Sequence, residues 1–368
     1  MAQVNVTINY RNSNGNNVPL QRVFVEHIAF GVPIGLYITD DQGRIRDNNG
    51  NQGISLIGVF NDCDIRILPH NSVARHQDKL AWADIHVTDN QVLNLRSSNT
   101  NHLAKYRKVN DCLTVYDKVF RQFEIFSTSS RREWPLGSTG SLKTKKNRKQ
   151  QIEIDHPSRF PVATISFTEP AGLVTGYPII HLFNNTISTV ASEMAHALHF
   201  SFLTASKRAI IERDYLGWLT GMVFTGGSPT HNLDVQTTPL VAYLESLDHF
   251  SSRFFSYIQL NPSETGATLR NNFMLSELRS GIFCSSYTGN LNTGTINRPQ
   301  FTGTSKEGAV YAAIFLDFSR QSGVGLKVAV NAYFRSGALS FGQYRTWIKR
   351  NKPELTVQID SAAARWGL

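Results

Sequence analysis

The chain has 368 residues and a formal net charge of +9 at pH 7, and 41% of its residues are hydrophobic and 11% aromatic. This composition excludes an intrinsically disordered chain, and the length predicts two or three domains with at least one substantial core. No apolar run approaches the roughly 20 residues that a membrane-spanning helix needs, so we expect no membrane span.

Residues 1–6 combine neither a basic start nor an apolar core, so we expect no secretory signal. The three cysteines, Cys63, Cys112 and Cys284, are widely spaced and odd in number, which favours reduced, buried thiols over a disulfide framework. We therefore expect synthesis in the cytoplasm. Export by a route that needs no cleaved signal remains an alternative.

Residues 1–96 are predicted to form an antiparallel β-sandwich of the Ig-like or regulatory type. Val4, Val6, Ile8 and Tyr10 alternate with polar residues, which is the period of a half-buried strand. Turn signals at short intervals separate further apolar runs, at Asn14-Gly15, Asp41-Gln42-Gly43 and Asn49-Gly50. The turn at 39–44 resembles those of small regulatory sandwich modules attached to many secreted peptidases.

The hydrophobic period changes near Ser97 from that of strands to that of helices. Apolar residues at three- and four-residue steps predict an amphipathic helix of about twenty residues, at Leu103, Tyr106, Val109, Leu113, Tyr116 and Phe120. Further strands are expected over 161–167 and 173–183. Further helices are expected over 239–258, 307–318 and 340–349, the last of them starting at Ser340 as N-cap. We therefore predict an α+β fold, with a second domain over 97–368.

Most of the excess positive charge lies in one segment, residues 128–150. It holds seven lysines and arginines against one glutamate, together with proline, glycine and serine residues that predict an exposed loop. The segment is interpreted as a solvated loop or as a contact for an acidic partner. No nucleic-acid motif occurs in it, so we expect no specific nucleic-acid binding.

The segment over 192–199 contains candidate catalytic and metal-binding residues. The helix that includes it is predicted to begin near Asn185 or Thr186. In an HExxH motif, two histidines on one helical face bind zinc and the glutamate activates the metal-bound water. Glu193 and His196 match the glutamate and the second histidine, whereas Ser192 stands where the first histidine belongs. The whole segment reads Ser-Glu-Met-Ala-His-Ala-Leu-His.

This segment, together with residues 242–250, resembles the gluzincins, the thermolysin-like zinc metallopeptidases. Residues 242–250 read Ala-Tyr-Leu-Glu-Ser-Leu-Asp-His-Phe and are similar to the second motif of that family, EGxADxF. The resemblance implies a zincin-like fold for 97–368, Glu245 as a zinc ligand, and a peptide or protein ligand in a cleft edged by the strand over 173–183. It implies zinc as the cofactor, and Ser192 leaves open whether zinc is bound.

The serine leaves only His196 and Glu245 of the family's ligands, because a neutral hydroxyl is a poor zinc ligand. His199, three residues after His196, could complete an alternative set displaced by about 4.5 Å along the helix axis. The other interpretation of His199 is a packed core histidine.

Three further residues have open roles. Asp248 and His249 could orient His196 or could lie on a solvated helix face. His231, shortly after Gly226-Gly227, is a candidate proton donor or oxyanion stabiliser, or a plain loop histidine.

Three functions are compatible with these residues. The leading one is a zincin-fold peptidase homologue with a degraded zinc site, catalytically silent or weakened, that acts through binding. The second is an active zinc peptidase with an atypical ligand set and Glu193 as general base. The third is an exported effector or cargo protein, delivered without a signal peptide, with residues 128–150 as a docking handle.

Overall fold

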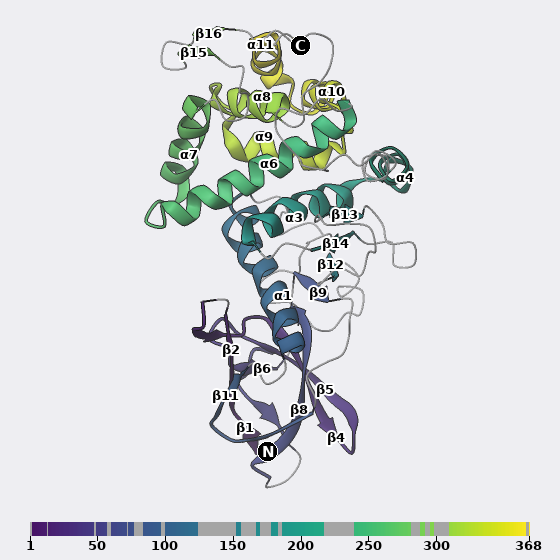
Figure 1. Ribbon diagram of the computed structural model, residues 1–368, viewed down its shortest axis with the longest axis vertical. Coiled ribbons are helices and arrows are strands. Elements are labelled where there is room, and N and C mark those ends of the chain that lie inside the picture. Colours follow the sequence, from purple (N-terminus) through teal and green to yellow (C-terminus); the bar gives the residue numbers. More distant parts are fainter. Residues whose placement is uncertain are drawn as a thin grey trace. The chain divides into compact units, whose positions relative to one another are not determined.

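The chain folds into two compact units in the computed structural model, unit 1 (Met1–Thr114, Phe126–Arg159 and Ile179–Phe183) and unit 2 (Val115–Ile125, Phe160–Pro178 and Asn184–Leu368). Strands dominate the described part of unit 1 and helices that of unit 2, which confirms the predicted α+β class (Figure 1). The structure describes residues 2–12, 14–47, 49–56, 60–71, 73–76, 84–96, 100–123, 152–155, 167–169, 178–182, 186–216, 239–280, 288–290, 295–297, 309–365 and 368.

Unit 1 is built from short strands in more than one sheet. One sheet has the order β14-β12-β9-β8-β4-β5-β6, with β10 also on β8; another has the order β11-β2-β3, and β1 pairs with β7. The strands are β1 (Gln3–Val4), β2 (Val6–Arg11), β3 (Asn17–Pro19), β4 (Val23–Ala29), β5 (Val32–Thr39), β6 (Ile45–Arg46), β7 (Ile54–Ser55), β8 (Asp62–Asn71), β9 (Ala74–His76), β10 (Ile85–Thr88), β11 (Gln91–Leu95), β12 (Ile152–Asp155) and β14 (Ile179–His181).

Among the described strands of residues 1–96, pairing is antiparallel, as predicted, apart from one pair. β2 and β11 run parallel, with Val6 opposite Gln91. β12, which comes later in the chain, is also parallel to both of its neighbours in unit 1, β9 and β14. Unit 1 therefore contains mixed sheets, which the alternation of single strands does not disclose.

One hydrophobic core holds the sheets of unit 1 together. On β2 the side chains of Val6, Ile8 and Tyr10 are buried, which confirms the predicted alternation. They share a core with residues of β4 and β8, among them Val25 and Ile67. Each such side chain contributes roughly 1.5–3 kcal/mol when it leaves water, so this core is the main source of stability in unit 1.

The helix α1 (Thr100–Lys118) packs its first turns on this core. Leu103, Tyr106 and Val109 are buried, as the helical spacing predicts. The Tyr106 hydroxyl donates a hydrogen bond to the carbonyl of Ile67 at 2.5 Å, so the buried phenol has a polar partner on β8.

The turn between β5 and β6 depends on Asp40 and Gly43. The Asp40 carboxylate accepts hydrogen bonds from the backbone N–H groups of Gln42 and Arg44, each at 2.9 Å. Gly43 adopts φ +77°, a left-handed conformation, and passes close to the backbone of Ile8. A Cβ on residue 43 would overlap the Ile8 carbonyl oxygen, so only glycine fits there.

The variant Gly43→Ala is therefore expected to lower the free energy of unfolding by about 2–3 kcal/mol, because it adds a backbone clash to the cost of a positive φ. Gly50→Ala is the matched control. Gly50 also has a positive φ, +84°, but within the described residues no atom lies within 4 Å of its added Cβ. The control should cost only about 1 kcal/mol. Equal losses for the two variants in urea denaturation would contradict the close approach at Ile8.

Unit 2 is built around the buried helix α3. The two longest of its described helices are α3 (Ile187–Phe202) and α6 (Pro239–Leu260). Its other elements are η2 (Phe120–Phe123), β13 (Phe167–Glu169), α4 (Ala205–Ile211), η3 (Glu212–Leu216), α7 (Gly266–Ser280), β15 (Thr288–Asn290), β16 (Thr295–Asn297), α8 (Ala309–Arg320), α9 (Gly325–Ser336), α10 (Phe341–Asn351), η4 (Pro353–Leu355) and α11 (Thr356–Arg365).

The packing of these helices explains the composition of α3. Every residue of α3 from Glu193 to Phe200 is buried. α3 packs against α6, against α9 and against β13, so it is covered on several sides (Figure 1). A helix that is apolar around most of its circumference is expected in such a place. No helix among the described residues is long and apolar enough to cross a membrane.

Candidate metal centre

Helix α3 begins where the sequence predicts it. Thr186 is the N-cap, and its hydroxyl accepts a hydrogen bond from the backbone N–H of Thr189 at 3.3 Å. This start fixes the helical register of the next three turns. Glu193 and His196, three residues apart, then lie on neighbouring positions of one helical face.

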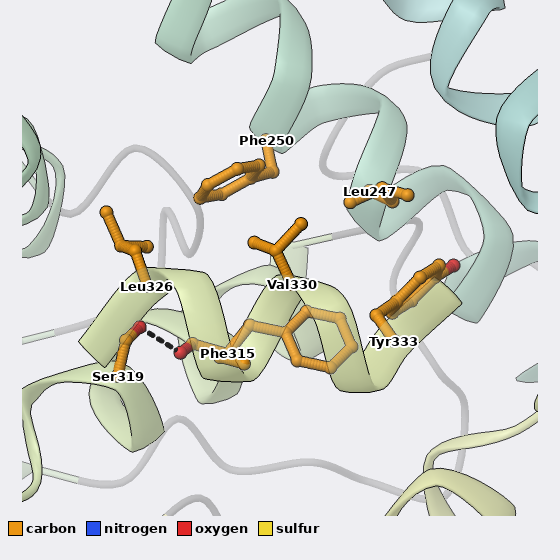
Figure 2. Close-up of a pocket in the computed structure, with 8 residues that line it drawn as sticks. Leu247, Phe250, Phe315, Ser319, Leu326, Val330 and Tyr333 are labelled. Atoms are coloured by element: carbon orange, nitrogen blue, oxygen red, sulfur yellow. Dashed lines mark hydrogen bonds between the residues drawn. The ribbon is translucent and has the colours of Figure 1, made fainter. Parts of the chain in front are cut away.

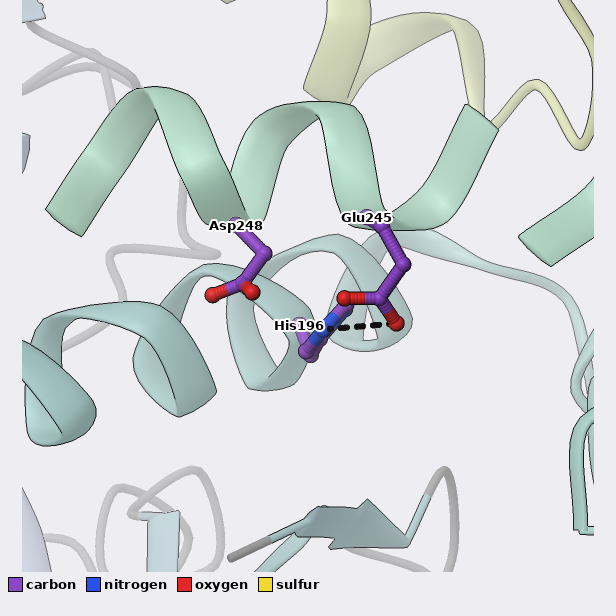
Figure 3. A group of neighbouring side chains, drawn as sticks. All are labelled: His196, Glu245 and Asp248. Carbon is purple, nitrogen blue, oxygen red and sulfur yellow. Dashed lines mark ion pairs between the residues drawn. The ribbon is translucent and has the colours of Figure 1, made fainter. Parts of the chain in front are cut away.

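Helix α6 supplies two carboxylates that extend toward α3 near His196. Glu245 and Asp248 are themselves three residues apart, so both project from the same side of α6 (Figure 3). The Nε2 atom of His196 lies 3.5 Å from Oε1 of Glu245. Ligand atoms of His196, Glu245 and Asp248 all lie within 4.8 Å of one another. The two helices therefore bring one imidazole and two carboxylates into a single group, here called the α3–α6 triad.

The three side chains of the triad are buried from solvent. The relative exposures of His196, Glu245 and Asp248 are 3%, 1% and 6%. Burial disfavours protonation of His196, but the charges of Glu245, Asp248 and Glu193 outweigh it and raise the pKa of His196 to about 9. Without a metal, His196 is therefore an imidazolium at pH 7 that balances buried carboxylate charge. A cation that replaces its proton would meet the same favourable field.

Ser192 contacts the triad without being part of it. Its hydroxyl donates a hydrogen bond to Oδ1 of Asp248. The residue in the place of the first histidine of HExxH therefore orients a carboxylate of the opposite helix. A carboxylate oxygen accepts more than one contact, so this hydrogen bond is compatible with metal coordination by the same group.

Glu193 is held by strand β13. The hydroxyl of Thr168 lies 2.7 Å from Oε2 of Glu193 and 3.0 Å from its backbone carbonyl oxygen. The single hydroxyl proton serves one of these acceptors at a time. Glu193 is 7% exposed, so its carboxylate lies at the edge of the core and not on an open surface. The contact with Thr168 had no counterpart in the sequence analysis.

His199 lies among aromatic rings and is not a member of the triad. Its ring centroid lies 4.8 Å from that of Tyr333 and 6.3 Å from that of Tyr243. The pKa of His199 is lowered to about 3, mainly by burial and then by the charge of His196, whereas a contact with the Ala338 backbone opposes the shift. His199 is therefore a neutral, packed histidine, which fits the second interpretation of this residue. His231 and the side chain of His249 lie outside the described residues.

The opposite side of α6 forms a small apolar pocket (Figure 2). Leu247 and Phe250 of α6 face Val330 and Tyr333 of α9 across it. The hydroxyl of Ser319 donates to the carbonyl of Phe315 at 2.5 Å, so this polar group of the lining is paired within α8. α6 thus has an apolar face toward α9 and an acidic pair toward α3.

The donor atoms of the triad fit a divalent cation. Two ligands of a tetrahedral ion with bonds of about 2.1 Å lie about 3.4 Å apart, which is close to the 3.5 Å between His196 and Glu245. Zinc accepts both imidazole nitrogen and carboxylate oxygen, as do Mn²⁺ and Fe²⁺. A buried cluster of this composition could hold a metal ion.

Comparison with known proteins adds no assignment. No protein-family model matches this chain, and no curated protein matches it either.

Proposed function

We propose that unit 2 is a zincin-like metallopeptidase homologue with an altered metal site, which acts mainly by binding and whose peptidase activity is silent or weakened. The observation that carries this proposal is the contact of 3.5 Å between His196 and Glu245. The gluzincin resemblance assigns these two residues, from two different helices, to one zinc ion. Their proximity supports that assignment because nothing in the spacing of the two motifs requires it.

Two observations favour a weakened activity. Ser192 makes a hydrogen bond to Asp248 and supplies no imidazole. Glu193, which would act as general base, is buried and lies within hydrogen-bond distance of the Thr168 hydroxyl. A general base must reach the proton of the attacking water, and a carboxylate engaged by Thr168 is less available for that step.

The proposed partner is a peptide or protein, the ligand class that the resemblance implies. When bound, a zinc ion in such a site would polarise a carbonyl group and activate a water molecule. His196 and Glu245 would bind the zinc ion. The basic segment 128–150, which lies outside the described residues, remains a proposed contact for an acidic partner.

An active peptidase with an atypical ligand set is the second candidate. Asp248 favours it, because this residue lies within 4.8 Å of both assigned ligands and would bring their number to three. Catalytic zinc sites use three protein ligands and keep one position for water or substrate.

The variant Ser192→His tests the proposed function. If unit 2 is zincin-like, the new imidazole should lie beside His196 and Glu245 and tighten zinc binding at least about tenfold, since ligands four residues apart share one helical face. The measurement is titration calorimetry with Zn²⁺ on the full chain, with Ser192→Ala as the variant that adds no ligand.

Peptide hydrolysis separates the two candidates. The wild-type chain should be inactive or slow on a casein digest, and Ser192→His should gain activity that the additional change Glu193→Gln abolishes while zinc stays bound. Wild-type turnover that Glu193→Gln abolishes would favour the active peptidase. A Ser192→His chain that folds but binds zinc no better than Ser192→Ala would refute the zincin-like assignment.

A further inference from the structure

We propose that Asp248 replaces the missing first histidine as a metal ligand, so that the wild-type chain binds a divalent cation through His196, Glu245 and Asp248, and that Ser192 is the residue that positions Asp248. This inference rests on the proposed function, since it concerns the same site. The inference goes beyond the proposed function because it assigns one metal ligand to α6, where the gluzincin motif has that ligand on α3. The resulting donor set has one nitrogen and two carboxylate oxygens in place of two nitrogens and one carboxylate.

The three side chains lie close enough together to share one ion. Asp248 lies on the face of α6 that carries Glu245, and its side chain extends toward α3 (Figure 3). The ligand atoms of the three residues span at most 4.8 Å. Two ligands of a tetrahedral ion with bonds of about 2.1 Å lie about 3.4 Å apart. Side-chain rotations that move each of these atoms by less than about 1 Å would therefore bring all three into bonding distance.

Ser192 supplies a hydrogen bond to Asp248 and not a metal ligand. A serine is too short and too weak a donor to replace an imidazole on zinc, yet its hydroxyl is directed at Oδ1 of Asp248. Groups that hydrogen-bond to a metal-binding carboxylate fix its orientation, and their loss commonly lowers metal affinity 10- to 100-fold. The substitution that removes one ligand from α3 thus supplies the hydrogen bond that orients a new ligand on α6.

The combined charge of the three side chains also favours a divalent cation. Two carboxylates and a neutral imidazole carry a charge of −2, which a divalent cation neutralises in full. Because all three side chains are buried, this compensation occurs where charge is poorly solvated. Carboxylate-rich sites also accept Mn²⁺ and Mg²⁺ more readily than imidazole-rich sites do. We therefore expect the preference for Zn²⁺ over Mn²⁺ to be smaller in the wild type than in Ser192→His.

The test is titration of the full chain, stripped with a chelator, with Zn²⁺ and with Mn²⁺ separately. The wild type should bind one ion per chain. Asp248→Asn, which keeps the shape of the side chain, should lose at least about 100-fold in affinity, and Ser192→Ala about tenfold. Asp360→Asn is the control for loss of a carboxylate, because Asp360 lies on α11 and pairs with Arg345 and Lys349. It should bind both ions as the wild type does.

X-ray absorption of the zinc-loaded wild type keeps the test decisive if Asp248→Asn does not fold. One imidazole and at least two further oxygen ligands are expected in the wild type, against two imidazoles in Ser192→His. Two imidazoles in the wild type would show that another histidine, such as His199, completes the set, and would overturn the inference.

Failure of this inference and failure of the proposed function have different signatures. If the wild type binds zinc and Asp248→Asn keeps that affinity within threefold, Asp248 is not a ligand, while the zincin-like assignment stands. The same holds if the wild type binds no metal and Ser192→His binds zinc. If neither chain binds metal although both fold, the inference and the proposed function both fail.

Discussion

Truncating Tyr333 to alanine is expected to lower the free energy of unfolding of unit 2 by about 4–6 kcal/mol. Replacing a buried aromatic ring by a methyl group costs about 3–5 kcal/mol through lost contacts and the cavity that remains, and loss of a buried hydrogen bond adds about 1 kcal/mol. Tyr333 is 1% exposed, and its hydroxyl donates to the carbonyl of Tyr243 at 2.9 Å.

The position of Tyr333 explains why a large part of the helical core depends on it. Its ring centroid lies 4.9 Å from that of Tyr243, 5.1 Å from that of Phe315 and 4.8 Å from that of His199. These partners come from α6, α8 and α3, so one side chain of α9 contacts three other helices. It also lines the apolar pocket beside Val330 (Figure 2).

Two variants make this prediction specific. Tyr333→Phe keeps the ring and loses only the hydroxyl, so it should cost about 1 kcal/mol. Val357→Ala, at a position of α11 that is 76% exposed, should stay within about 0.5 kcal/mol of the wild type. The free energies come from urea denaturation followed by near-ultraviolet circular dichroism. A loss below 2 kcal/mol for Tyr333→Ala would mean that the aromatic cluster does not stabilise unit 2 as its burial indicates.

Local signals in the sequence identified the helix ends and faces that local chemistry determines. Thr186 and Ser340 are the N-caps of α3 and α10, and each accepts a hydrogen bond from the backbone N–H three residues later. The helix predicted over 239–258 is α6, and the one over 307–318 begins at Ala309 in the described structure as α8. A hydroxyl at an N-cap and a periodic apolar face act within a few residues, so the sequence discloses them directly.

The helices α7 and α9 were not predicted, for a physical reason in each case. α7 has a largely polar sequence in which Leu269 and Phe273 are the buried apolar positions that the structure identifies, too few for a clear periodic signal. α9 begins at Gly325, its N-cap Val324 offers no side-chain hydrogen bond, and the glycines on either side of Val324, Gly323 and Gly325, both have a positive φ. Here tertiary packing, not an end signal, determines the helix.

The metal centre could be predicted only in part. Ser192, Glu193, His196 and Glu245 were identified from two motifs, but Asp248 was considered as a group that orients His196 or as part of a solvated helix face, and not as a ligand. Its spacing of three residues from Glu245 is a signal that it shares a face with that ligand. Which side chains Asp248 contacts depends on how α6 packs on α3. This packing is determined by the whole core and not by residues near Asp248 in the sequence. The contact between Thr168 and Glu193 is non-local in the same way.

Acidification is expected to destabilise unit 2 through His199, by about 3 kcal/mol between pH 6.5 and pH 4. In the unfolded chain this histidine has its ordinary pKa near 6.5, whereas burial lowers its pKa to about 3 in the folded state. Between these values the unfolded state binds a proton that the folded state does not. The contribution of His199 to stability therefore rises by about 1.4 kcal/mol per pH unit between about pH 3 and pH 6.5. Above pH 6.5 this contribution is constant.

The variant His199→Leu removes this group and keeps an apolar side chain of similar volume beside Tyr333. Its free energy of unfolding, measured in urea at pH 7.5, 5.5 and 4.5, should fall less steeply with acid than that of the wild type, by about 1.4 kcal/mol per pH unit below 6.5. Other groups that titrate in this range are common to both chains and cancel in the comparison. Parallel acid profiles would show that His199 takes up its proton in the folded protein. Such a result would mean that the contact with the Ala338 backbone, or solvent, stabilises a proton on a ring that the structure surrounds with Tyr243, Phe200 and Tyr333.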